Sequence, residues 1–234
     1  MTLAAAGTFR LKRPWGTGLT GGNDVTNVTA ANDRLRRLWQ EYAPRYDGDM
    51  VRLERMLLDD GRAWVCGQAK GKVLEVAIGS ARNLEFYPAD VSLTGLDLSP
   101  AMLDIARKRA ADQGREVEFV EGEAHELPFP DGAFDTVVCT LGLCSVPDER
   151  PVIAEMRRVL RPGGRLLLLD HVGSHHKLLF FWQRLLEKSM LRQCGDYQTR
   201  RPLPLVQQAG FVIEYQKRLK LGCVERVVAR KPEA

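Results

Sequence analysis

The sequence predicts an α/β domain built as a doubly wound, seven-stranded and mostly parallel sheet, with a helical cap at its N-terminal side. Short β-rich runs alternate with helical runs from residue 72 onward, which is the pattern of strand–helix–strand units. The runs at 72–78, 134–141 and 164–172 are apolar on both faces, as expected for strands buried between two helical layers. No internal repeat or second core is evident, so we expect one domain over 29–234.

The N-terminal part is predicted to hold a tail and a cap. Residues 1–28 lack apolar periodicity and are rich in turn-forming residues, which favours a flexible tail. Apolar residues at helical spacing then predict a helix; they are Leu35, Leu38, Trp39 and Tyr42. We expect Pro44 to end this helix and Asp47 to begin a second one as its N-cap, giving a helical cap over 29–60.

The remaining elements follow from turn and capping signals. Ser99, Pro100 and Gly114 frame a helix over 99–113. A second helix over 148–160 should end in a turn at 161–164, where proline and glycines interrupt it. Two further helical stretches after residue 177 belong to a region at 175–210 that we expect to form a lid over the substrate. The predicted strands are 72–78, 91–98, 116–122, 134–141, 164–172, 211–216 and 223–230.

Composition excludes several classes of protein. The longest purely apolar run is five residues, Leu178 to Trp182, whereas a membrane span needs about 20. The five cysteines are odd in number and form no C-x-x-C pair, which argues against a disulfide framework or a structural metal and favours a cytoplasmic setting. Net charge is +4, with +7 in residues 171–234. We interpret this basic third as a solvated face, so contact with a membrane is not favoured, and no nucleic-acid motif accompanies it. The alternative is that Leu178 to Trp182 form a stripe that touches a membrane or a second copy of the chain.

A ligand site is expected beyond the carboxyl ends of the strands. Asp97 ends the second predicted strand, 22 positions after Glu75, a spacing typical of a carboxylate that binds ribose hydroxyls. The turn after the first strand keeps only Gly79 of a G-x-G-x-x-G pattern, which disfavours a dinucleotide such as NAD or FAD.

Five segments together resemble the class I S-adenosylmethionine-dependent methyltransferases, in the ubiquinone/menaquinone methyltransferase branch. The resemblance covers residues 40–170 well and implies the Rossmann-like methyltransferase fold, a methyl-transfer activity, and S-adenosylmethionine as cofactor with S-adenosylhomocysteine as product. The segments are YAPRYD (42–47), VLEVAIGSARN (73–83), LTGLDLSPAML (93–103), EGEAHELPFPDGAFDTVVCTLGL (121–143) and RVLRPGGRLLLLD (158–170).

The resemblance implies roles for matching residues. Asp97 would bind the ribose, Glu123 the adenine amine, and Tyr46 the methionine carboxylate. The full set of implied cofactor-binding residues is Tyr46, Glu75, Ala77, Gly79, Ala81, Asn83, Asp97, Leu98, Met102, Glu123, Ala124 and Leu141.

The chain departs from the family at three of these positions. Ala77 and Ala81 stand where glycine is usual, and Glu123 stands where aspartate is more usual. An alanine is tolerated where the backbone has φ < 0, although its methyl group narrows the approach to a ligand.

Methyl transfer requires a base only if the acceptor must lose a proton. Candidates at the ends of the fourth and fifth predicted strands are Cys144, Asp170 and His171, of which His171 titrates nearest neutrality. A purely hydrogen-bonding role for His171 remains an alternative. No metal site is expected.

Segments in the C-terminal half resemble small-molecule thiol methyltransferases, so we favour S-methylation of a small apolar acceptor. O- or C-methylation of a phenol or quinone, and a non-catalytic scaffold that binds the cofactor, are the alternatives. The predicted substrate-contacting residues are Tyr42, Cys144, Phe181 and Trp182. The chain is expected to act as a monomer or homodimer.

Overall fold

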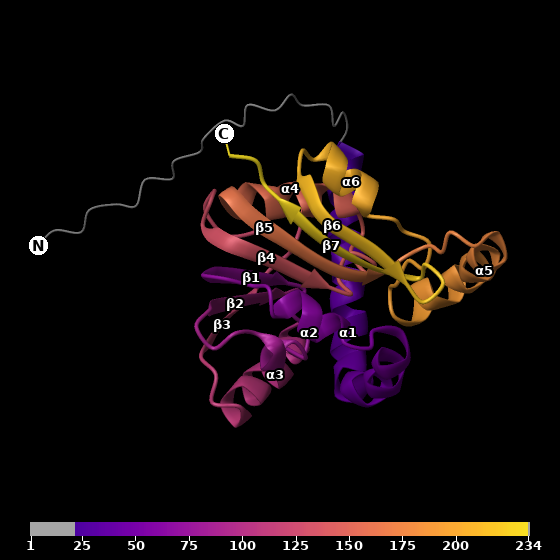
Figure 1. The fold of residues 1–234 in the computed structure, drawn as a ribbon. Helices are drawn as coiled ribbons and strands as arrows, with labels where there is room; N and C mark the ends of the chain where they lie inside the picture. Colours follow the sequence, from indigo (N-terminus) through magenta and orange to yellow (C-terminus); the bar gives the residue numbers. More distant parts are fainter. Residues whose placement is uncertain (1–21, 234) are drawn as a thin grey trace, which may run out of the picture.

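A computed structural model describes residues 22–233, and it shows a single seven-stranded sheet in the order β3-β2-β1-β4-β5-β7-β6 (Figure 1). Strand β7 runs antiparallel to both β5 and β6, whereas the pairs from β3 to β5 are parallel. The strands are β1 (Lys72–Val76), β2 (Ser92–Asp97), β3 (Val117–Glu121), β4 (Phe134–Thr140), β5 (Leu160–His171), β6 (Val212–Leu219) and β7 (Val224–Arg230).

Helices cover both faces of the sheet, and each face has its own apolar core. On one face α4 and α6 pack on strand side chains such as Leu74 and Leu168. On the other face α2 and α3 pack on their strand neighbours, such as Val73 and Leu167. The helices are α1 (Gly22–Leu57), α2 (Gly61–Cys66), the 3₁₀ turn η1 (Leu84–Phe86), α3 (Pro100–Asp112), α4 (Glu149–Val159), α5 (Lys177–Gln193) and α6 (Leu203–Gln208).

The predicted doubly wound fold is confirmed, and every predicted strand is present. The capping signals also hold, because Ser99 Oγ accepts a hydrogen bond from Met102 N and the Asp148 side chain accepts one from Arg150 N.

Helix α1 differs from the predicted pair of helices. It runs unbroken past Pro44 to Leu57, so the expected break at Pro44 is wrong. Pro44 and Gln40 both lie on the exposed side of α1, where water can satisfy the carbonyl group that loses its helical partner. The helix also begins at Gly22, inside the predicted tail, and the rest of that prediction, residues 1–21, lies outside the described residues.

The predicted turn at 161–164 is part of β5 instead. Strand β5 begins at Leu160 and pairs there with Phe134, before an irregularity in the register that ends at Thr136. The turn chemistry is still visible in Gly163, whose φ is +74°. The proline and glycines therefore form a bulged strand start rather than a separate loop.

Two features of the fold bear on location and partners. Among residues 22–233, no helix is both long enough and apolar enough to cross a membrane. Helix α5 stands away from the sheet, beyond the ends of β6 and β7 (Figure 1), and none of its residues is buried.

Candidate functional site

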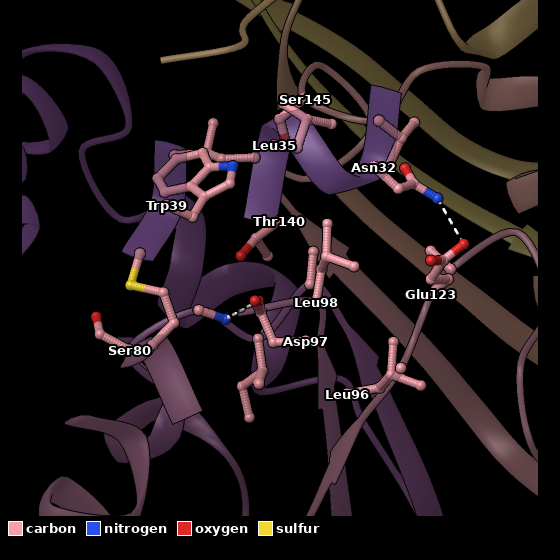
Figure 2. A pocket seen from close by; sticks show the side chains of 18 of the residues that line it. Asn32, Leu35, Trp39, Ser80, Leu96, Asp97, Leu98, Glu123, Thr140 and Ser145 are labelled. Carbon is pink, nitrogen blue, oxygen red and sulfur yellow. Dashed lines mark hydrogen bonds between the residues drawn. The ribbon is translucent and has the colours of Figure 1, made fainter. Parts of the chain in front are cut away.

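A pocket of about 820 Å³ opens at the carboxyl ends of β1, β2 and β4. Helix α1 forms its opposite wall through Asn32, Leu35, Trp39 and Tyr46 (Figure 2). Most of the predicted cofactor residues line this pocket; they are Tyr46, Ala77, Gly79, Asp97, Leu98, Met102, Glu123, Ala124 and Leu141.

The three other predicted cofactor residues lie behind the pocket wall. Glu75 is 1% exposed and accepts hydrogen bonds from Asn83 Nδ2 at 2.6 Å and from the Tyr87 hydroxyl at 2.9 Å. Ala81 is fully buried in the core beneath the loop. Glu75 and Asn83 therefore support the loop that follows β1 from the inside rather than line the pocket.

Burial changes the protonation of Glu75. Burial raises the pKa of this carboxyl to about 7, even though the hydrogen bonds from Tyr87 and Asn83 and the nearby charge of Arg62 lower it. A buried carboxyl that titrates near neutrality sits beneath the loop.

The loop after β1 adopts a left-handed backbone at alternate positions. Ala77, Gly79 and Ala81 each have φ of +57°, so the two alanines do not have the negative φ at which alanine is readily tolerated. Alanine in this conformation is strained by about 1–2 kcal/mol. The surrounding hydrogen bonds hold the loop in place, since Ile78 N bonds to Leu96 O and Ala81 N to Ile78 O, both at 3.0 Å.

Asp97 fixes this loop from the end of β2. Its Oδ2 accepts a hydrogen bond from Gly79 N at 2.8 Å, and its Oδ1 accepts one from Ser99 N at 2.9 Å (Figure 2). Burial raises the pKa of this carboxyl, while the backbone N–H groups lower it. Each carboxylate oxygen has a second lone pair, so Asp97 can still accept hydrogen bonds from a ligand in the pocket.

The far side of the pocket is closed by a contact between α1 and the segment after β3. Asn32 Nδ2 donates to Glu123 Oε2 at 2.6 Å (Figure 2). Leu98 and Met102 supply apolar parts of the pocket wall. The pocket thus offers apolar side chains together with the carboxylates of Asp97 and Glu123.

Arg62 on α2 is the main pocket residue that the sequence reasoning missed. Its Nη1 donates to Asn83 Oδ1 at 2.7 Å and to Thr140 Oγ1 at 3.0 Å, and its Nη2 pairs with the Glu54 carboxylate. Its Nε is buried and has no hydrogen-bond partner within the described residues. The sequence signal was an arginine inside the short apolar segment GRAWVC, where a charge is costly unless it has partners.

A second polar cluster lies next to the pocket, at the ends of β4 and β5. His171 Nε2 lies 3.8 Å from Asp196 Oδ2, the Cys144 thiol lies 3.9 Å from Asp196 Oδ1, and Cys144 N donates to Asp170 Oδ2 at 3.2 Å. Neither ring nitrogen of His171 has a hydrogen-bond partner among residues 22–233.

The charges of this cluster set its protonation. Burial lowers the pKa of His171, but Asp196 and Asp170 outweigh it and raise that pKa above the usual value. Burial raises the pKa of the Cys144 thiol well above its usual range, and Asp170 and Asp196 add to the effect. Cys144 is therefore a neutral thiol, whereas the two aspartates favour the protonated form of His171.

The other predicted substrate residues lie outside the pocket wall. Phe181 and Trp182 are each 54% exposed on α5, and neither lines the pocket. Tyr42 lies on α1 in a ring cluster with Trp39 and Tyr46, at centroid distances of 5.8 and 6.0 Å. Of these aromatic residues only Trp39 and Tyr46 reach the pocket.

Comparisons with known proteins identify the family. A family model described as a methyltransferase domain matches residues 74–168. The chain is 31% identical to the thiol S-methyltransferase TMT1A of Homo sapiens, across 71% of this chain and 70% of that protein. It is 37% identical to the demethylmenaquinone methyltransferase of Deinococcus radiodurans, across 58% of this chain and 59% of that protein. The chain thus spans about six tenths of the length of that relative.

Solved structures agree on the fold. A methyltransferase structure from Bacillus halodurans covers 74% of this chain at a TM-score of 0.64 and 21% identity. A methyltransferase structure from Thermotoga maritima covers 84% at a TM-score of 0.64 and 18% identity. With the sequence relatives, these matches show that the chain belongs to the class I S-adenosylmethionine-dependent methyltransferases, in the branch that resembles the quinone methyltransferases.

Proposed function

We propose that this protein transfers the methyl group of S-adenosylmethionine to a small, largely apolar acceptor. The observation that carries the proposal is that Arg62, whose buried Nε has no hydrogen-bond partner within the described residues, lines the same pocket as Asp97. An N–H group buried without a partner is costly, and a ligand carboxylate would satisfy it. The pocket residues thus fit a zwitterionic amino-acid end at Arg62 and a nucleoside end near Asp97.

Each part of the pocket has a function in this proposal. Asp97 would accept hydrogen bonds from the ribose hydroxyls, Leu98 and Met102 would pack on the adenine, and Glu123 would accept from its amine. Tyr46 and Trp39 close the pocket from α1, which keeps water from the reacting centre. When bound, S-adenosylmethionine supplies a methyl group on a positively charged sulfur, and the protein contributes mainly proximity and orientation.

We favour a thiol as acceptor. One relative is a thiol S-methyltransferase, and the cluster beside the pocket provides a proton acceptor in His171, whose imidazolium form the Asp196 carboxylate would stabilise. A thiolate is a strong nucleophile, so this single proton acceptor suffices. A phenol or quinone acceptor is the second candidate, because the demethylmenaquinone methyltransferase is also a relative.

The experiment that tests the proposal has two stages. Isothermal titration with S-adenosylmethionine should show binding, and a ligand present at about 100 Kd should raise the unfolding free energy by about 2.7 kcal/mol. A panel of thiols, phenols and quinones with labelled cofactor then identifies the acceptor. Binding without methyl transfer to any member would favour the non-catalytic scaffold, and absence of binding would contradict the proposal.

The other predicted properties remain proposals with direct tests. We propose that the protein functions without a metal, which elemental analysis of the active protein tests. Light scattering tests the expectation of a monomer or homodimer, and cell fractionation tests the expected cytoplasmic location.

A further inference from the structure

Helix α5 presents a continuous apolar face to the outside of the molecule. The large side chains on this face are exposed by 54 to 73%; they are Leu178, Phe181, Trp182, Leu185 and Leu186. Their spacing places them on one side of the helix, and Phe181 and Trp182 contact each other at a centroid distance of 5.9 Å. So large an apolar face on the outside of a protein indicates a binding surface.

The opposite side of α5 faces the rest of the protein. Its only acidic residue, Glu187, accepts hydrogen bonds from Thr199 N and Thr199 Oγ1 at 2.8 and 2.7 Å. Gln183 also points inward, because its Oε1 accepts from Ser174 N at 2.8 Å and its Nε2 donates to Val172 O at 3.0 Å. These contacts fix the rotation of the helix, so the apolar face is held outward.

Basic residues flank this apolar face on one side. Lys177, Arg184, Lys188 and Arg192 are exposed, and none of the four forms an ion pair within the described residues. With Glu187 turned inward, α5 presents no acidic side chain to the outside; its exposed residues are apolar or basic, apart from Ser189 and Gln193. Aromatic and leucine side chains beside lysines and arginines are the pattern of helices that lie in the headgroup layer of a bilayer.

The surface continues onto a second element. Leu221, in the turn between β6 and β7, is 68% exposed, and its carbonyl accepts a hydrogen bond from Ser174 Oγ at 2.6 Å, just before α5 begins. Lys220 beside it is also basic, but its Nζ is paired with Asp59 Oδ2 at 2.8 Å, so the basic character of this edge comes from α5. The β6–β7 turn and the start of α5 therefore form one apolar and basic edge, which we call the α5 edge.

We propose that the α5 edge binds the surface of an anionic lipid bilayer, with α5 lying in the plane of the headgroups. Charge complementarity favours this occupant over a second copy of the chain, because two copies face to face would bring their basic flanks together. The loop after α5 returns to the site, since Tyr197 N donates to Cys144 O at 2.9 Å. Contact with the bilayer would therefore bring the reaction site close to apolar acceptor molecules dissolved in the lipid.

Vesicle flotation with the full chain tests the proposal. We expect binding to vesicles of phosphatidylcholine with about one third phosphatidylserine, much weaker binding to pure phosphatidylcholine, and loss of binding as salt is raised, because charges at this surface are screened. Phe181→Ser with Leu185→Ser should reduce binding by about tenfold or more, since two buried apolar contacts are lost. Val212→Ser, at an exposed apolar site on β6, is the matched control and should bind as the unchanged protein does.

A spectroscopic measurement places the helix directly. Brominated lipids should quench tryptophan fluorescence in the unchanged protein, and Trp182→Phe should keep vesicle binding but lose most of the quenching. Flotation that survives the double substitution, or quenching that survives Trp182→Phe, would overturn the proposal. So would a stable dimer, measured by light scattering, that the double substitution dissociates while vesicles never bind.

Discussion

Arg62 Nη1 lies 2.7 Å from Asn83 Oδ1 and donates a buried hydrogen bond to it, which connects α2 to the loop after β1. Asn83 in turn donates to Glu75 on β1, and Arg62 pairs with Glu54 on α1. The arginine therefore joins the cap to the sheet, while its own buried Nε has no hydrogen-bond partner within the described residues. We expect both cofactor affinity and the position of the cap to depend on this side chain.

We expect Arg62→Gln to weaken binding of S-adenosylmethionine by about 10- to 100-fold, since a charge-assisted contact contributes about 1.5–3 kcal/mol. Removing the arginine alone also leaves one oxygen of the buried Glu54 carboxylate without its partner, while the other stays paired with Arg82 at 2.9 Å, and we expect this to lower stability by about 1–3 kcal/mol. The double variant Glu54→Gln/Arg62→Gln removes both charges and should recover most of that stability but not the affinity. Calorimetry and denaturant unfolding separate the two effects, and Arg107→Gln on the exposed face of α3 is the control. Normal affinity in the double variant would contradict the assignment.

Asp97→Asn should weaken cofactor binding by about tenfold or more, because an amide has one acceptor oxygen where the carboxylate has two. The same change should lower stability by about 1–3 kcal/mol, since Gly79 N and Ser99 N cannot both keep their partners. Calorimetry and thermal unfolding measure the two quantities. Asp104→Asn, on an exposed position of α3, should change neither. Unchanged affinity in Asp97→Asn would remove the ribose assignment.

We expect Ala77→Gly to preserve binding and to raise the free energy of unfolding by about 0.5–1 kcal/mol. Relief of the backbone strain at φ of +57° stabilises the folded protein by about 1–2 kcal/mol. The greater conformational freedom of glycine in the unfolded chain offsets about 0.5–1 kcal/mol of this stabilisation. Ala81→Gly should leave the free energy of unfolding almost unchanged, because loss of the buried Ala81 methyl group removes a further ~0.8 kcal/mol of stabilisation. Denaturant unfolding checks both variants. A loss of more than about 1 kcal/mol in Ala77→Gly would contradict this account of the loop.

The rate of methyl transfer should depend on the protonation of His171. A base must be neutral, so the rate should rise with pH through the pKa of His171, which Asp196 and Asp170 hold above its usual value. Asp196→Asn removes one of the charges that raise this pKa, so the acidic limb should move to lower pH. His171→Gln should abolish the limb, and His175→Gln, at an exposed position, should leave it in place. Because an acceptor thiol also titrates, all variants are compared with the same acceptor. If the acidic limb of the pH–rate profile stays in place in Asp196→Asn, His171 is not the base.

The fold could be predicted from the sequence because its signals are local. Apolar runs predicted each strand to within a few residues, and Ser99 caps the helix that it was expected to cap. Pro44 shows where local signals fail, because its cost to a helix is small when the freed carbonyl faces water. The predicted start of β5 was also wrong, because pairing between Leu160 and Phe134 extends the strand across residues that favour a turn.

The site could be predicted only in part. The residues that line the pocket at the strand ends were found because their position follows from strand order. Arg62 was missed because its importance lies in contacts with Glu54, Asn83 and Thr140, which come from distant parts of the chain. Phe181 and Trp182 were predicted to contact the substrate because of their aromatic character and the place of their segment along the chain, and neither feature distinguishes a pocket wall from the exposed face on which they lie.

The unbroken α1 also affects how a ligand enters and leaves. Asn32 holds the helix to Glu123 at one end of the pocket, and Glu54 holds it to Arg62 at the other. Asn32 and Glu54 are 22 positions apart, which is about 33 Å along the helix at 1.5 Å per residue, and Leu35, Trp39 and Tyr46 in that stretch cover the pocket. Further ion pairs hold the helix between its ends, from Arg36 to Glu121 and from Asp47 to Arg82 and Arg109. We therefore expect exchange of spent for fresh cofactor to require that several of these contacts break together, and a slow opening of this kind would limit the rate of turnover.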